Sequence, residues 1–303
     1  MSVVGLLGSR PVAAAFGVAT RGRLRSVAYH SVDDAAAFAA QLDLFAALGC
    51  HTVSAAQVSA ALHDGAPLPR RPLWITFDDG DASVVRVALP LLRARGMVAT
   101  AFLCGAWVGG SEAPWWQVVE AATPPADVVA TRLALKAAPD AERRERVAEM
   151  LSRLAAAGSP AVGQQWTTDD VAAWLAAGND IGNHSWDHPC LDRCDADEQR
   201  RQVRLAHERL SELTGTTVDV FAWPNGDPAP AALDELRVLG YRLVAECDHR
   251  LVRRSAGPLA VSRLKLDSDV DLARTRAIVS GAHSTVFHLQ QRLRGRRPVN
   301  GIT

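Results

Sequence analysis

The chain of 303 residues carries 33 Lys and Arg residues against 33 Asp and Glu residues, so its formal net charge is zero. A hydrophobic fraction of 48% and a charged fraction of 22% are typical of globular proteins and exclude a disordered, collagen-like or coiled-coil chain. Because no net charge attracts polyanions, we expect no nucleic-acid partner. The length suits two ordinary domains or one α/β barrel, and it leaves the oligomeric state open.

The cysteine content and the apolar start of the chain indicate in which cellular compartment the protein is found. Five cysteines are too few for a disulfide framework and cannot all pair, which favours a reducing cytoplasm. The first 20 residues lack a basic beginning, and Arg10 and Pro11 interrupt them, so we expect no signal peptide. The apolar run over 11–19 is too short to span a bilayer, and we expect no stable membrane insertion.

Short apolar runs alternate with amphipathic segments in the first third of the chain. Apolar side chains spaced four and three apart, at Phe38, Leu42 and Phe45, indicate a helix with one buried face. We predict strands over 24–30, 73–77 and 97–103, and helices over 35–48, from Ser54 to near Gly65, and over 82–95 with a kink at Pro90.

The segment 109–165 interrupts this alternation. It begins with irregular sequence around Trp115 and Trp116 and continues into a charged helix over 140–156. We interpret the segment as a helical insertion within one domain, in which the two tryptophans pack the insertion itself. The charged helix is expected to bury a stripe of three apolar residues, Val147, Leu151 and Leu154.

The alternation resumes after the insertion. Thr167 with Asp170 resembles a capping box, which opens the next helix. Further strands are predicted over 180–183, 218–223, 241–245 and 259–266, and further helices over 195–213, 231–239 and 270–279. Seven strands separated by helices indicate a parallel, right-handed α/β architecture.

Three carboxylates follow the strand 73–77 within four residues, at Asp78, Asp79 and Asp81. Adjacent carboxylates repel one another unless a cation or hydrogen bonds compensate them. A helix N-cap accounts for Asp81 but not for the adjacent pair. Because parallel α/β folds place active sites at the carboxyl ends of their strands, the pair is a candidate functional site.

His184 and His188 follow the strand 180–183. Pro189 disfavours a helix at this point, so we expect a loop to present both imidazoles. Alone, such a spacing also occurs in pairs of surface histidines. Together with Asp79 it gives two histidines and one carboxylate with open coordination positions, which suits hydrolytic Zn²⁺ or a related divalent ion.

Two motifs, Thr76-Phe77-Asp78-Asp79-Gly80 and His184-Ser185-x-x-His188-Pro189, resemble the principal motifs of the polysaccharide deacetylase (NodB-homology) family, carbohydrate esterase family 4. The segment 221–226 (FAWPNG) is similar to the third motif of that family. Tyr29-His30 resembles the opening motif of the subgroup whose acid-bearing motif lies near the N-terminus, as in poly-N-acetylglucosamine deacetylases. The resemblance extends over about 25–266.

The resemblance implies an α/β fold, a deformed (β/α)7 barrel that carries the helical insertion. We divide the chain into an N-terminal extension over 1–24, the barrel domain over 25–288 and a basic C-terminal tail over 289–303. We interpret the tail as solvated. Its basic residues are Arg292, Arg294, Arg296 and Arg297.

The resemblance also implies metal-dependent N-deacetylation of an amino sugar or a polysaccharide-related carbohydrate. Asp79, His184 and His188 then bind a divalent metal, with Zn²⁺ as the expected ion. Asp78 is the general base that takes the proton of the attacking water. An amide hydrolase with a non-sugar substrate and a non-catalytic carbohydrate-binding protein of the same fold are the alternatives.

Two positions depart from the pattern of the family. The third motif often carries an arginine that holds the base, where this chain has Ala222, and an aromatic residue where it has Asn225. Arg263, on the strand 259–266, is the candidate replacement for that arginine, and an ordinary arginine at the barrel rim is an equal alternative. A backbone N–H near Asn225 is the candidate donor to the oxyanion.

The leaving amine needs an acid. We favour His30, which ends a predicted strand, over His288, which lies near the C-terminus as the acid does in unpermuted members of the family. Aromatic residues inside the motifs are candidates for stacking on a sugar ring. The expected substrate-binding residues are Trp186, Trp223, Pro224 and Asn225.

Overall fold

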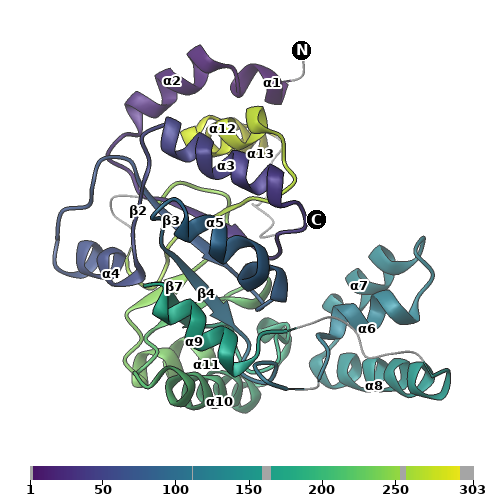
Figure 1. The fold of residues 1–303 in the computed structure, drawn as a ribbon. Coiled ribbons are helices and arrows are strands. Elements are labelled where there is room, and N and C mark those ends of the chain that lie inside the picture. The colour runs from purple at the N-terminus through teal and green to yellow at the C-terminus, as the bar shows by residue number, and fades with distance from the viewer. Residues whose placement is uncertain (1–2, 111, 159–164, 253–256, 294–303) are drawn as a thin grey trace.

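The structure is a computed structural model that describes residues 3–110, 112–158, 165–252 and 257–293 (Figure 1). Its strands form one parallel sheet in the order β7-β6-β5-β4-β3-β1-β8, with β2 paired to β3. The strands are β1 (Arg25–Tyr29), β2 (His51–Thr52), β3 (Pro72–Phe77), β4 (Ala99–Leu103), β5 (Asp180–Asn183), β6 (Val220–Ala222), β7 (Leu243–Ala245) and β8 (Leu264–Lys265).

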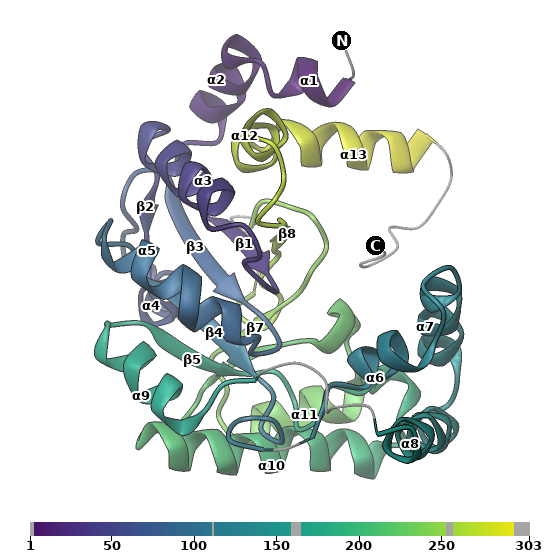
Figure 2. The same cartoon turned by 45° about the vertical axis from the view of Figure 1, so that its right-hand side comes forward.

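One segment near the C-terminal end of the chain joins the two edges of this sheet. Val261 pairs with Ala245 at the end of β7, and β8 then pairs with β1. The sheet is therefore curled into a deformed barrel with helices around it (Figure 2). This confirms the predicted (β/α)7 architecture, to which β2 adds a short strand that the sequence patterns did not indicate.

The inner strands are buried on both faces, as parallel sheets covered by helices usually are. Every residue of β1 and β3 is buried. The covering helices are α3 (Ala35–Ala47), α4 (Ala55–His63), a π-helical turn (Val84–Ala88) that leads into α5 (Leu89–Arg93), α9 (Thr168–Ala176), α10 (Ala196–Thr214), α11 (Pro230–Val238) and α12 (Leu272–Ser280). Two short 3₁₀ turns, Leu191–Arg193 and Pro224–Gly226, follow β5 and β6.

The helices α1 (Val3–Leu7), α2 (Arg10–Ala19) and α13 (Ala282–Leu293) are additions to the predicted elements. All three pack near α12 at one side of the barrel, as both views show. Helix α13 continues past the predicted start of the tail, while Arg294, Arg296 and Arg297 lie outside the described residues. Within the described residues, no helix has both the length and the apolar character needed to cross a bilayer.

The predicted insertion contains three helices that stand beside the barrel, α6 (Trp115–Ala122), α7 (Val128–Ala137) and α8 (Asp140–Ala156) (Figure 1). They share a small core of their own. Val147 is part of that core, but Leu151 is 45% exposed and Met150 is buried in its place. The predicted stripe is therefore wrong at Leu151, because the buried face of α8 contains Val147 and Met150, which lie three positions apart.

Candidate metal centre

Two loops at the carboxyl ends of β3 and β5 carry the predicted metal ligands. Asp79, Ser185 and His188 have positive φ angles of 73°, 72° and 54°. Non-glycine residues rarely adopt this left-handed conformation unless the surrounding structure imposes it, and such residues cluster at functional sites. Both loops are therefore held in shapes that local sequence preference does not favour.

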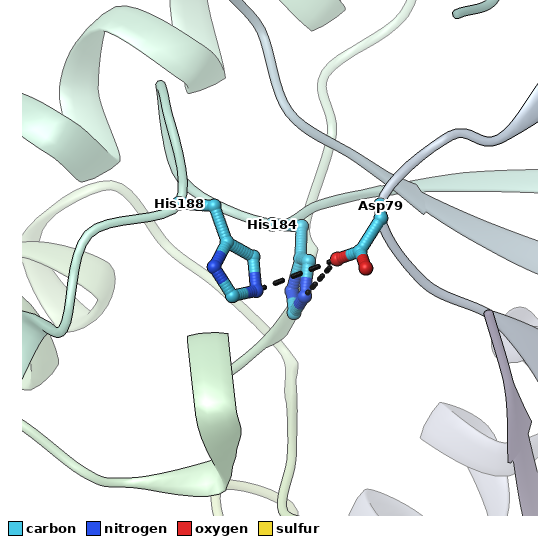
Figure 3. A group of neighbouring side chains, drawn as sticks. All are labelled: Asp79, His184 and His188. Atoms are coloured by element: carbon cyan, nitrogen blue, oxygen red, sulfur yellow. Dashed lines mark ion pairs between the residues drawn. The ribbon is translucent and has the colours of Figure 1, made fainter. Parts of the chain in front are cut away.

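The carboxylate of Asp79 points toward both imidazoles (Figure 3). Its Oδ1 is 3.3 Å from Nε2 of His184 and 3.4 Å from Nε2 of His188. Ligand atoms about 2.0–2.2 Å from a tetrahedral Zn²⁺ lie roughly 3.3–3.6 Å from one another. Asp79 Oδ1 is also buried and makes no hydrogen bond to any described residue. The spacing and the unbonded buried oxygen fit a divalent ion held by these three side chains.

His184 is held in the tautomer that a metal ligand requires. Its Nδ1 lies 2.8 Å from the carbonyl oxygen of Ala222, which can only accept, so Nδ1–H donates there and the neutral ring has its lone pair on Nε2. Burial alone would lower the pKa of His184, but the carboxylates of Asp78 and Asp79 outweigh burial and raise it. Ala222 thus supports the site through its backbone, at the position where the family pattern often has arginine.

His188 lies among tryptophan rings. Its ring centroid is 4.8 Å from that of Trp116 and 6.4 Å from that of Trp107. Burial lowers the pKa of His188 to about 3 despite the opposing charge of Asp79, so the imidazole is neutral and able to bind a metal. The interpretation that Trp115 and Trp116 only pack the insertion is wrong, because both contact His188. No motif in the sequence indicated that these two tryptophans would contact the metal-binding loop.

Arg263 forms a buried two-pronged ion pair with Asp78. Its Nη1 and Nη2 lie 2.6 and 2.9 Å from Oδ1 and Oδ2 of Asp78, and the two residues are 1% and 3% exposed. Arg263 also donates to Oγ1 of Thr76 and to the carbonyl oxygen of Glu246, which fixes its plane. Burial acts to raise the pKa of Asp78, but the charge of Arg263 lowers it below the ordinary value. This contact with Asp78 favours the first of the two alternatives for Arg263, namely that it replaces the arginine that the family often has in the third motif.

The two candidate acids occupy different places. His30 directly follows β1, the neighbour of β3, and the backbone N–H of Asp78 donates to the carbonyl oxygen of Tyr29, the residue before His30. His288 lies in α13, where its Nε2 is 3.2 Å from Nε of Arg250. The structure therefore places His30 beside the loop that carries the two aspartates, and it places His288 against an arginine.

The four predicted substrate-binding residues differ in their access to solvent. Trp186 is half-buried and packs over Gly105, where a Cβ atom would lie 2.9 Å from the indole. Trp223 is 2% exposed and belongs to the core under α11, and Pro224 is also buried. The prediction of a sugar-stacking wall at Trp223 is therefore wrong in this conformation. Asn225 keeps an accessible side chain and has a left-handed backbone, with φ 58°.

A family model described as polysaccharide deacetylase matches residues 65–244, which is more than half of the chain. The match includes both aspartates and both histidines of the site. The chain belongs to the polysaccharide deacetylase family.

Relatives of this chain include a curated protein of Escherichia coli strain K12, poly-beta-1,6-N-acetyl-D-glucosamine N-deacetylase. The two are 27% identical over 266 residues, which cover 76% of this chain and 34% of the relative. The chain therefore spans about a third of the length of the curated relatives it matches.

Solved structures share the fold of this chain. IcaB from Ammonifex degensii superposes with a TM-score of 0.62 at 20% identity, covering 86% of this chain and 97% of that one. The Streptococcus pyogenes deacetylase PplD superposes with a TM-score of 0.61 at 17% identity, covering 84% and 97%. At these identities the likeness establishes the barrel fold.

Proposed function

We propose that this chain is a divalent-metal-dependent N-deacetylase that acts on N-acetylated amino sugars of a polysaccharide. The observation that carries the proposal is the meeting of three metal-ligand side chains with an arginine-held aspartate at one rim of the barrel. The family and the named activity of the E. coli relative support the substrate class. Tyr29-His30 supports membership of the subgroup that deacetylates poly-N-acetylglucosamine.

Five residues have defined tasks in this reaction. Asp79, His184 and His188 hold a divalent ion, expected to be Zn²⁺, which when bound supplies Lewis acidity and lowers the pKa of water. Asp78 accepts the proton of the water that attacks the amide carbon. Arg263 keeps Asp78 ionised and orients it, and the remaining lone pairs of the carboxylate stay available for that proton.

Proton donation completes the cleavage. As the C–N bond breaks, His30 gives a proton to the leaving amine, and the hydroxyl from water remains on the acyl carbon. A backbone N–H at Asn225 stabilises the negative charge that develops on the carbonyl oxygen. The products are acetate and the free amino sugar.

A non-catalytic carbohydrate-binding protein is one alternative, and it is favoured by Ala222, which stands where the family often has an arginine that holds the base. The buried pair of Asp78 and Arg263 weakens this argument, because the candidate base has a cationic partner supplied from another strand segment. A non-sugar amide substrate is the second alternative, because the groups described act on the amide rather than on a sugar.

Acetate release tests the proposal. With Zn²⁺, the purified chain should release acetate from N-acetylglucosamine oligomers. Asp78→Asn should retain zinc but lose about 10²–10⁴-fold in turnover, because general-base catalysis is worth that much. Asp43→Asn, at an exposed carboxylate on α3, is the matched control and should behave as wild type. Release from non-sugar amides alone, or full activity in Asp78→Asn, would contradict the proposal.

We also propose a cytoplasmic location, supported by the five cysteines, all of which are free thiols. Disulfides are rare where thiols are kept reduced. Fractionation of cells that express the native gene should place the protein in the cytoplasm, and recovery from an extracytoplasmic fraction would contradict this.

A further inference from the structure

The two candidate metal-binding histidines are supported in different ways. His184 is oriented through its own ring, by the hydrogen bond from Nδ1–H to Ala222. The Nδ1 atom of His188 is buried and has no hydrogen-bond partner among the described residues. Because a bond from the second ring nitrogen normally orients a metal-bound imidazole, His188 must owe its orientation to other contacts.

Helix α6 of the insertion supplies two of these contacts. Nε1–H of Trp115 donates to the carbonyl oxygen of His188 over 3.2 Å, which fixes its backbone. The ring of Trp116 meets the imidazole edge-on, with centroids 4.8 Å apart and planes at 73°. Trp107, outside the three insertion helices, lies nearly parallel to the imidazole at 20°. The tryptophans therefore restrict both the backbone and the ring of His188.

Helix α8 supplies a third contact, through the residue before His188. Nη1 and Nη2 of Arg144 lie 2.7 and 3.0 Å from the two carboxylate oxygens of Asp187. The same guanidinium also bonds Asp140 on α8 at 2.6 Å and Glu198 on α10 at 3.1 Å. An isolated surface pair contributes little, but a two-pronged pair within a network fixes geometry. Arg144 thus joins the insertion, the metal-binding loop and α10.

The contacts from α6 and α8 are connected inside the insertion. Arg143 is 3% exposed, bonds Asp140 and places its guanidinium 5.4 Å from the ring centroid of Trp115. Asp140 in turn bonds Arg144. A continuous set of contacts therefore crosses the insertion and reaches the loop of His188 at both ends.

We propose that the helical insertion positions His188 for metal binding, with Trp115, Trp116 and Arg144 as its positioning residues. The proposal rests on the proposed function in one respect, namely that Asp79, His184 and His188 bind a metal. Residues that orient metal ligands typically change metal affinity by about 10–100-fold when replaced. Since linkage is reciprocal, zinc binding should also stabilise the insertion.

A zinc titration in competition with a chelating dye tests this role. Arg144→Ala should weaken zinc binding by about 10–100-fold. Arg144→Lys keeps the charge but not the two-pronged geometry, so it should restore only part of the affinity. Arg146→Ala is the matched control, because Arg146 lies on the same helix, is 42% exposed and, among the residues that the structure describes, pairs only with Glu142 on that helix. It should bind zinc as wild type does.

Trp115→Phe is a second variant. It keeps an aromatic side chain and removes the N–H donor to His188, and its smaller ring also leaves space in the core of the insertion. It should also weaken zinc binding, and thermal unfolding of the metal-free variant measures the packing that the smaller ring loses. Amide hydrogen exchange gives a readout independent of activity. Zinc should slow exchange in α6 and α8 of the wild type and have a smaller effect in Arg144→Ala.

The outcomes separate the two proposals. If wild type does not bind zinc, the proposed function and the positioning role both fail. If wild type binds zinc and releases acetate, while Arg144→Ala and Trp115→Phe bind zinc equally well, the positioning role alone is overturned. Weaker binding in both variants, with Arg146→Ala unchanged, supports it.

Discussion

At the scale of single residues, the pairing of Asp78 with Arg263 is the feature that most affects the chemistry. The two side chains lie 185 positions apart in the sequence and are almost completely buried. Burying two charges is costly, and their attraction offsets the cost only with good geometry and additional hydrogen bonds. Arg263 has both, through its two-pronged contact and its bonds to Thr76 and Glu246. An aspartate held in this way stays ionised and fixed in orientation.

Replacing Arg263 should change the pH dependence of turnover. In Arg263→Met, burial is no longer opposed by the guanidinium, so the pKa of Asp78 should rise. The base is then protonated up to a higher pH, and the acid limb of kcat/KM should move to higher pH. The profile is measured on zinc-loaded enzyme, with zinc content as the control. An unmoved acid limb with normal zinc content would show that Arg263 does not hold the base.

Replacing His30 should separate proton donation from metal binding. His30→Gln should lower kcat by about 10²–10⁴-fold, because the leaving amine loses its acid. Zinc affinity should stay that of wild type, since His30 is not among the three ligands. The matched variant is His288→Gln, which should keep full kcat because His288 lies against Arg250. Loss of kcat in His288→Gln rather than His30→Gln would reverse the assignment of the acid.

At the scale of elements, the sequence predicts best the helices and strands whose start or end is marked by a local signal, such as a capping residue. The capping box of Thr167 and Asp170 opens α9 as expected, and β5 has its predicted bounds. Helices α1, α2 and α13 were not predicted, because they depend on packing near α12 rather than on local sequence signals. Ser9, for example, makes no side-chain cap at the start of α2. Local patterns therefore predict an element best when its ends are marked in the sequence.

Strand β5 carries a steric requirement that leads to a stability prediction. A Cβ on Gly182 would lie 2.5 Å from the ring of Phe102 and 2.9 Å from Val220. Gly182→Ala should therefore destabilise the protein by about 1–3 kcal/mol, the usual cost of overpacking a core. Chemical denaturation measures the change. Gly17→Ala, on α2 with no atom near its Cβ position, is the control and should not destabilise, because alanine favours helix. Equal stability of the two variants would contradict the packing described.

At the scale of the whole molecule, barrel closure brings the site together. The motifs predicted the residues of the metal centre, because the carboxyl ends of parallel strands meet at one rim. They left the partner of Asp78 open, since Arg263 reaches it only when the last segment joins β7 to β1. They also gave no role to the insertion, because its contact with His188 depends on how α6 and α8 pack beside the barrel. Local motifs predict chemistry, and long-range packing decides which groups support it.

The central claim is that Asp79, His184 and His188 form one metal centre, and anomalous diffraction at the zinc edge tests it most directly. Crystals grown with Zn²⁺ should show one strong peak about 2.0–2.2 Å from Asp79 Oδ1 and from Nε2 of both histidines. Crystals of an Asp79→Ala/His184→Ala variant should lack that peak. A wild-type crystal with no peak at these three side chains, or with the ion bound elsewhere, would contradict the account.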